Sequence, residues 1–449
     1  MNVLRISVAG KGSDFVGLNI TSDVRCVTFP MGYAITSSDN ADITPSLRSE
    51  ILLLIRKICD CEKLQGERVC RINKNDLRHD FPIGSILFLI EDFLNRGSYY
   101  TEKEKVMGEG LPGKISWNST IKRIKPIVSE RGIAFLDFIV HKSRIKHDRL
   151  ITELHKYCVY KSFELLGFLY TSALPEQGLI NEADVKKNKA YYVRFLDSKI
   201  SETHLEQNAE LFVHMKNLIQ NFDSEDTISS ATYGTNSFHT VWESMVDKMY
   251  GTVSRSEMEK YYYPCSKWKK PNGEKLKNNA PLRPDTIMVC KDGNGSECCF
   301  ILDSKYYSYA AMTNNGADES EENSQISVSA HGSIPGTDSI QKQITYAEFI
   351  DRSKTPPPPN NENLAKYKFD SDKIFNAFIL PGKVENESGI EYIGYAEADW
   401  NTQATEGYRK IHGFLLDTKT VMQKHVSPSD VRKTLAGRIL TEISNIPQQ

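Results

Sequence analysis

Two aspartates and a lysine lie at the ends of two adjacent apolar runs, and their chemical types suit reactions at a phosphate. Asp285 begins the run "DTIMVC", and Asp303 and Lys305 close the run "CCFILDSK". Carboxylates are oxygen ligands that suit Mg²⁺, and a nearby lysine can orient water or offset charge that develops on a phosphate. These three residues are therefore candidates for metal-dependent cleavage of a phosphodiester.

The Asp-x-Lys pattern occurs three times after an apolar run, so the tripeptide alone does not identify a site. The other copies are residues 197–199 ("DSK") and 417–419 ("DTK"). Only the middle copy follows a strand that starts with Pro-Asp and is joined to it by a turn, "KDGNGSE". Because side chains alternate along a strand, Asp303 and Lys305 are expected on one face, within reach of Asp285. We therefore favour the middle copy.

Helices on both sides of the strand pair carry further candidates. Glu243 lies in "FHTVWESMVDK", at the border of an apolar helix face, where it is either a third metal ligand or a solvated carboxylate. Lys342 and Gln343 lie in "QKQITY", on a helix that should pack beside the site. Long donor side chains there suit a phosphate backbone, and a polar helix face is the alternative.

The stretch before Asp285, "CSKWKKPNGEKLKNNAPLR", is strongly basic. The net charge of the chain is only −2, so binding of a polyanion must come from local patches such as this one. A solvated loop is the alternative. The residues expected to contact the polyanion are Lys267, Lys269, Lys270, Arg283 and, on the later helix, Lys342.

The bulk composition bounds the class of protein. With 449 residues the chain is long enough for two or three domains, and 39% hydrophobic with 25% charged residues is typical of a soluble globular protein. No apolar run reaches 18 residues and the start lacks a signal peptide, so we expect a cytoplasmic protein that does not cross a membrane. Nine scattered cysteines predict free thiols.

The pattern of elements predicts an α/β (α+β) fold. Residues 1–228 are expected to be mostly helical, with helices over 45–60, 81–97, 147–170 and 204–222. Residues 229–449 are expected to form a central mixed β-sheet flanked by helices. Its elements are helices over 238–251 and 339–350, the two strands of the candidate site, and strands over 373–381, 390–400 and from 412, the last turning into a helix.

Two segments of the second half are expected to lie outside its regular elements. The Gly/Ser/Asn-rich composition of 312–337 predicts a mobile insert, and the proline run in 353–364 predicts a linker that is not helical.

Glu on a helix, Pro-Asp, Asp-x-Lys and a helix with glutamine and tyrosine together resemble the PD-(D/E)xK nuclease superfamily. The chain more closely resembles the LlaJI family of bacterial restriction endonucleases, and it is also similar to McrC-type nuclease subunits. Segments that carry the LlaJI resemblance are "GKISWNSTI" (113–121), "YGTNSFHTVWESM" (233–245), "RPDTIM" to "LDSKYY", "DSIQKQITYAEF" (338–349), "FNAFILPG" (375–382) and "IHGFLLDTK" (411–419). They extend over most of the chain.

The resemblance implies a role for each matching residue. Asp285 and Asp303 would bind Mg²⁺, Lys305 would be the catalytic lysine, and Glu243 would be an accessory acid and metal ligand. Gln343 is a weaker transfer, because its spacing to Tyr346 is one residue shorter than the usual Gln-x-x-x-Tyr.

The implied function is that of a type II site-specific deoxyribonuclease that cuts double-stranded DNA in a restriction-modification system. Implied partners are a cognate methyltransferase and either a second copy of the chain or a McrB-like GTPase. The helical N-terminal half would serve recognition or partner binding. The alternatives are a McrC-like subunit that cuts only with its GTP-hydrolysing AAA+ partner, and a DNA-binding subunit that does not cut. The sequence holds no nucleotide-binding motif, so any motor would be a separate chain.

Overall fold

The structure is a computed structural model, and it divides into two compact units. The described residues are 3–10, 14–21, 24–35, 43–64, 77–79, 82–130, 132–146, 150–171, 173–221, 230–306, 334–352, 368–398, 400, 407–423 and 428–445. The first unit combines residues 1–78 with 232–449, and the second is 79–231. The N-terminal segment thus groups with the C-terminal half, which differs from the expected division at residue 228. The reason is a set of long-range contacts that local periodicity does not reveal.

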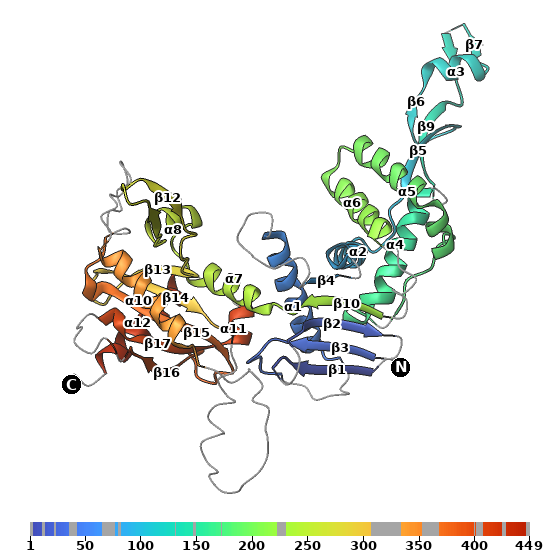
Figure 1. Cartoon of the computed structure of the whole chain (residues 1–449). Helices are drawn as coiled ribbons and strands as arrows, with labels where there is room; N and C mark the ends of the chain where they lie inside the picture. The colour runs from blue at the N-terminus through green and yellow to red at the C-terminus, as the bar shows by residue number, and fades with distance from the viewer. Residues whose placement is uncertain are drawn as a thin grey trace. The chain divides into compact units, whose positions relative to one another are not determined.

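A mixed five-stranded sheet forms the core of the C-terminal part of the first unit (Figure 1), as predicted. Its strands, in spatial order, are β13 (Thr286–Lys291), β14 (Glu297–Ser304), β15 (Ile374–Gly382), β17 (Ile411–Asp417) and β16 (Ile390–Ala396). The β13–β14 pair is antiparallel, β14, β15 and β17 are parallel, and β16 is antiparallel to β17. The fold is therefore of the α/β class, and the carboxyl ends of three strands meet at one edge.

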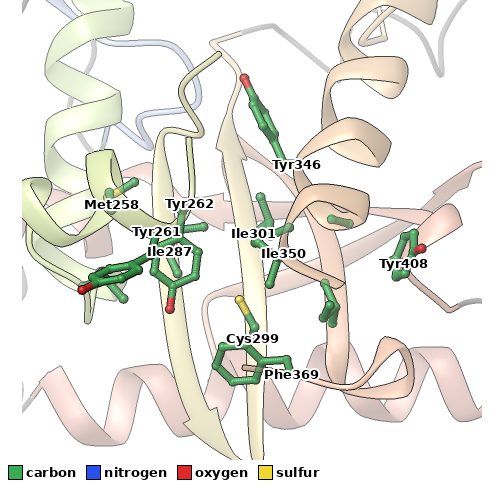
Figure 2. Close-up of a cluster of buried hydrophobic side chains, with 13 residues drawn as sticks. Met258, Tyr261, Tyr262, Ile287, Cys299, Ile301, Tyr346, Ile350, Phe369 and Tyr408 are labelled. Carbon is green, nitrogen blue, oxygen red and sulfur yellow. The ribbon is translucent and has the colours of Figure 1, made fainter. Parts of the chain in front are cut away.

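Helices cover both faces of this sheet. On one face, α8 (Arg255–Tyr261) and α10 (Thr337–Arg352) pack on β13 and β14. Figure 2 shows Ile287 and Ile301 from these strands between Tyr261 of α8 and Ile350 of α10. On the other face, Trp242 of α7 (Phe238–Tyr250) donates from its indole nitrogen to the Ile379 carbonyl at 3.3 Å. The C-terminal helices α11 (Thr418–Gln423) and α12 (Pro428–Ser444) contact the sheet at β17 and β13.

A two-stranded ribbon and two short 3₁₀ turns complete the C-terminal part of this unit. The ribbon pairs β11 (Lys267–Lys269) with β12 (Lys275–Asn278). The 3₁₀ turns are η5 (Ser371–Lys373) and η7 (Gly407–Arg409).

A second sheet occupies the N-terminal part of the first unit, where mostly helical structure was expected. Its strands, in spatial order, are β1 (Val3–Val8), β3 (Val24–Phe29), β2 (Val16–Thr21), β10 (Ser230–Thr235) and β4 (Leu77–His79), and α1 (Pro45–Leu64) follows β3. In β2 the side chains of Val16, Leu18 and Ile20 are buried and that of Asn19 is exposed. This alternation is the strand signal, and it is confined to a segment too short to outweigh the helical periodicity that follows.

The second unit combines a helical bundle with a β-rich arm (Figure 1). The bundle contains α2 (Ile83–Arg96), α4 (Leu150–Leu166), η3 (Gly167–Leu169), α5 (Glu182–Glu202) and α6 (Glu206–Asn221). The arm contains β5 (Glu102–Glu109), β6 (Lys114–Ile115), α3 (Trp117–Arg123), β7 (Ile127–Ser129), β8 (Gly132–Ala134) and β9 (Ile139–Lys146). The predicted helices over 81–97, 147–170 and 204–222 are confirmed, and the strands of the arm were not predicted.

Four smaller expectations concern the insert, the linker, the cysteines and membrane crossing. The predicted insert 312–337 lies outside the described residues except for its last four, and the predicted linker 353–364 lies wholly outside them. Cys61 is disulfide-bonded, so the expectation of free thiols is wrong there, whereas Cys158 and Cys299 are free and buried. Within the described residues, no helix has the length and apolar character needed to cross a membrane.

Candidate active site

Asp285, Asp303 and Lys305 come together at the end of the β13–β14 pair. Thr286 pairs with Leu302, so the register places Asp285 beside Asp303 on the neighbouring strand. The backbone N–H of Ser304 donates to Oδ2 of Asp285 at 2.9 Å. Nζ of Lys305 lies 2.6 Å from Oδ2 of Asp303, and these side chains are 19% and 13% exposed. The three groups therefore form one compact, partly buried cluster.

Glu243 on α7 belongs electrostatically to the same cluster. Burial raises the pKa of Asp285 well above its usual range, and the charges of Asp303 and Glu243 raise it further. The Ser304 N–H and the Lys305 ammonium oppose this shift without cancelling it. Three carboxyl groups on three elements thus share one region of unfavourable negative charge.

The helix α10 contributes a tyrosine and a glutamine. The hydroxyl of Tyr346 donates to the Arg283 carbonyl at 3.1 Å, and burial together with the charges of Asp303 and Asp285 raises its pKa. In Figure 2 the Tyr346 hydroxyl points away from the apolar cluster. Gln343 is fully buried, and neither atom of its side-chain amide has a hydrogen-bond partner among the described residues. An unpartnered buried amide is costly, so Gln343 is a candidate for holding a ligand or an ordered water.

Arg255 on α8, which was not predicted from the sequence as a site residue, also interacts electrostatically with Asp285. Arg255 on α8 lies 3.8 Å from Asp247 on α7, and Thr286 donates to Asp247 at 3.1 Å. Burial lowers the pKa of Arg255, but a hydrogen bond with Tyr263 and the charges of Asp247 and Asp285 outweigh it and raise that pKa. The local sequence pattern near Arg255 is the capping box of α8. A capping box predicts where a helix begins, but it does not predict which residues the Arg255 side chain contacts.

The other two Asp-x-Lys copies lie in different settings. Asp197 and Lys199 lie inside α5, where Lys199 pairs with Glu102 at 2.9 Å. Asp417 ends β17, and its carboxylate caps α11 by accepting the Thr420 N–H at 2.8 Å. Asp197 lies in a helix, and the strand residue that pairs with Asp417 is Gly382, so within the described residues neither copy is paired with an aspartate as Asp303 is with Asp285.

The basic residues predicted before Asp285 are exposed on the β11–β12 ribbon. Lys267 and Lys269 are exposed on β11, with Trp268 62% exposed between them, and Lys270 follows in the turn. The base of the ribbon is closed by the Leu282 N–H donating to the Pro264 carbonyl at 2.9 Å. Because Leu282 is three residues from Asp285, the ribbon is attached directly to the site. Arg283 is exposed and stacks over the Tyr263 ring at 5.9 Å, and Lys342 is exposed on α10.

The donor set fits a hard divalent cation. Asp285, Asp303 and Glu243 offer only oxygen atoms, which are the ligands of Mg²⁺, and a cation would relieve the repulsion that raises the pKa of Asp285. Across the described ranges, no three His, Cys, Asp or Glu side chains are already arranged to hold a metal ion. Asp303 is paired with Lys305 instead. The metal-binding role of the three carboxylates stays a prediction.

Comparison with known proteins decides the family. A family model described as LlaJI restriction endonuclease matches residues 15–400, most of the chain. The chain belongs to the LlaJI restriction endonuclease family. The match includes residues of both units, so it covers β2, β3 and the arm of this LlaJI-family protein as well as the candidate site.

Two individual proteins are similar to this LlaJI-family chain. One is the Bacillus subtilis (strain 168) protein named Type II restriction enzyme BsuMI component YdjA, which is 26% identical over 305 residues. The alignment covers 64% of this chain and 57% of that protein, so the chain spans less than two thirds of its relative. The other is a structure of Thermococcus gammatolerans McrB AAA+ hexamers with bound McrC, with 11% identity over 96% of this chain and 83% of that one. Its TM-score of 0.34 does not establish a shared fold.

Proposed function

We propose that this chain is a Mg²⁺-dependent type II restriction endonuclease that hydrolyses phosphodiester bonds of double-stranded DNA at a specific sequence. The observation that carries this proposal is the cluster of Asp285, Asp303 and Lys305 at the end of one strand pair, in a chain of the LlaJI family. Paired carboxylates with an adjacent lysine are the groups that metal-dependent phosphodiester cleavage needs.

Each charged group of the cluster has a proposed role. Asp285 and Asp303 would hold Mg²⁺ with Glu243 as accessory ligand, and the bound ion would supply charge neutralisation and a more acidic water. Lys305 would donate to a phosphate oxygen or orient the attacking water. Its ammonium is 2.6 Å from Asp303 and therefore already beside the position that the scissile phosphate must approach.

Residues on α10, on α8 and just before β13 would complete the surroundings of the phosphate. Gln343 would use its unpartnered amide to hold a ligand or an ordered water. Lys342, Arg283 and Arg255 would add positive charge around the scissile phosphate.

The β11–β12 ribbon would contact the DNA. Two exposed strands without a core of their own are marginally stable, so the ribbon is better explained as a contact surface than as a structural element. Its exposed lysines, Lys267, Lys269 and Lys270, neutralise phosphates, and a two-stranded ribbon fits the major groove.

A second candidate is a nuclease subunit that cuts only with a partner, such as a McrB-like GTPase. Two observations favour it. The B. subtilis relative is named as a component of its enzyme. In addition, the arm of the second unit exposes a group of large apolar side chains, namely Val106, Met107, Leu111, Trp117, Ile121, Ile127, Val128, Ile133 and Leu136. Exposed apolar patches of this kind mark protein interaction sites.

We propose that the exposed apolar side chains of the arm bind a separate subunit of the same restriction system. Lys114, Lys122, Arg123 and Lys125 are exposed among the apolar residues, so an apolar groove with an acidic rim would be complementary.

Digestion of plasmid DNA separates these functions. Unmethylated plasmid is incubated with the chain and Mg²⁺, with and without GTP and a co-expressed neighbouring protein, and with EDTA or a methylated plasmid as controls. Cleavage without nucleotide supports the autonomous enzyme, and cleavage only with the partner supports the subunit. An Asp303→Ala variant should bind DNA without cutting it, and unchanged cleavage by this variant would refute the assigned site.

A further inference from the structure

The loop after β3, residues 30–33, lies against the carboxyl ends of all three parallel strands. The Met31 N–H donates to the hydroxyl oxygen of Tyr306, which follows β14, at 2.8 Å. The Met31 carbonyl accepts from the hydroxyl of Thr418, which follows β17, at 3.0 Å. Gly32 packs so closely on Gly382, at the end of β15, that a Cβ there would lie 2.6 Å from its Cα. The N-terminal sheet thus fills part of the edge at which α/β sheets commonly bind ligands.

Tyr306, which makes the first of these three contacts, directly follows Lys305, the candidate catalytic lysine. The Lys305 N–H donates to the Ile379 carbonyl at 2.9 Å, which ties its backbone to β15. The Tyr306 ring lies 5.5 Å from the ring of Phe238, at the start of the helix that carries Glu243. Tyr306 is partly buried, and burial raises the pKa of its hydroxyl. The Met31 contact therefore fixes the far end of a side chain whose backbone adjoins Lys305.

Contacts of Tyr33 with Phe29 and Lys419 also hold the 30–33 loop in place. Tyr33 stacks on Phe29 with ring centroids 4.6 Å apart, and the Lys419 ammonium lies 5.8 Å from the centre of the Tyr33 ring. Nζ of Lys419 also lies 2.6 Å from Oε1 of Glu50 on α1, whose side chain is 4% exposed. Lys419 of the third Asp-x-Lys copy therefore ties the 30–33 loop and α1 to the end of β17.

From these contacts we infer that the 30–33 loop positions Lys305 through Tyr306, so that the N-terminal sheet is part of the catalytic apparatus. Met31, Gly32 and Tyr306 are positioning residues in this arrangement. The inference rests on the proposed nuclease function for its activity readout. It assigns a role to the N-terminal segment that differs from the recognition or partner-binding role expected for residues 1–228.

Removal of the Tyr306 hydroxyl tests the contact. Tyr306→Phe should slow single-turnover cleavage roughly tenfold while leaving DNA affinity within about twofold, because a misplaced lysine acts on the chemical step and not on binding. The matched control is Tyr170→Phe in the second unit, since the Tyr170 hydroxyl likewise makes a partly buried 2.9 Å hydrogen bond, to Glu91. This control should cleave at the wild-type rate.

Displacement of the loop tests the same relationship independently. Gly32→Ala introduces a Cβ against the Gly382 backbone and should slow cleavage on the order of a hundredfold, as for a small displacement of a catalytic group. Gly97→Ala is the control, because Gly97 has a similar φ of +65° against +70° and open space around its Cβ position. The backbone strain is then the same in both variants, and only the contact with β15 differs.

A readout that does not need cleavage separates failure of this inference from failure of the proposed function. The rate of acylation of the Lys305 side-chain amine, followed by mass spectrometry, should rise in Tyr306→Phe and in Gly32→Ala but not in either control. Unchanged acylation and wild-type cleavage in Tyr306→Phe would overturn the inference. If Gly32→Ala does not fold, Tyr306→Phe alone tests whether the loop positions Lys305. A wild-type chain that cuts no DNA under any condition would refute the nuclease function, while acylation still tests the positioning.

Discussion

The backbone N–H of Ser304 donates to Oδ2 of Asp285 at 2.9 Å, and Ser304 stands between Asp303 and Lys305 in the chain. One hydrogen bond therefore joins the start of β13 to the end of β14 at the point where three charged side chains meet. The pairing holds the two carboxyl groups together despite their mutual repulsion. The raised pKa of Asp285 follows from burial and from the closeness of these negatively charged groups. The expected stabilisation by Mg²⁺ has the same origin.

Replacement of Asp285 by asparagine should remove a pH-dependent loss of stability. The folded-state pKa of Asp285 is raised above its ordinary value of 3.8, so the wild type loses stability as the pH rises from that value through the folded-state pKa. Asp285→Asn has no such loss and should have the higher midpoint of thermal unfolding at neutral pH, with the difference vanishing near pH 3.8. Scanning fluorimetry between pH 4 and 8 measures it, with Asp197→Asn as an exposed control. Parallel pH curves for Asp285→Asn and wild type would contradict the prediction.

Mg²⁺ should stabilise the protein through the same carboxylates. A ligand that binds only the folded state at ten times its Kd adds about 1.4 kcal/mol, which corresponds to a rise of about 2–4 °C in the unfolding midpoint. The rise should be lost in Asp303→Ala and kept in Asp197→Ala, whose aspartate lies inside α5. An equal rise in both variants would place the metal elsewhere.

The three lysines of the Asp-x-Lys copies should respond differently to truncation. Lys305→Ala should lower cleavage by a factor of about 10² to 10³, as for loss of a donor to developing charge. Lys419→Ala should instead destabilise the fold by about 3 kcal/mol, because it leaves the buried Glu50 carboxylate without its cation. Lys199→Ala should cost less than about 1 kcal/mol and leave cleavage unchanged. Cleavage rates and denaturation curves of the three variants test this order, and a similar profile for all three would refute it.

The ribbon lysines should set the salt dependence of DNA binding. Each phosphate that the protein no longer neutralises reduces the slope of log K against log salt by about 0.9, so the double variant Lys267→Ala, Lys269→Ala should lower the slope by about 2. Fluorescence anisotropy in EDTA, which prevents cleavage, gives the slope. The control is Lys186→Ala with Lys187→Ala, two exposed lysines of α5 in the second unit. If both double variants bind with the wild-type slope, the ribbon does not contact DNA.

Gln343 should show opposite effects on stability and activity. Its buried amide has no partner among the described residues, so Gln343→Leu removes a desolvation penalty and should raise the free energy of unfolding by roughly 1 kcal/mol. The same change should lower cleavage roughly tenfold or more if the amide holds a ligand in the site. Paired measurements of denaturation and single-turnover cleavage decide this. A less stable variant with full activity would contradict both parts.

The local part of the site was predictable from the sequence. The two strands, the turn between them, α7 and α10 were all predicted, because period-2 and period-3.6 patterns and Gly/Asn turns are encoded in contiguous residues. Strand alternation also predicted that Asp303 and Lys305 share a face, and the 2.6 Å contact between them agrees. The choice among three Asp-x-Lys copies followed from the preceding Pro-Asp strand, which is again a local feature.

The three-dimensional structure was needed to show which distant segments of the chain contact this strand pair and its helices. Met31 meets Tyr306 across 275 residues and Thr418 across 387, and neither pairing leaves a periodic signal in the sequence. The approach of Arg255 to Asp285 and the complete burial of Gln343 likewise depend on how α8 and α10 pack on the sheet. The candidate catalytic groups could be found from the sequence because they lie on one strand pair. Long-range packing determines what holds them in place, including the N-terminal sheet.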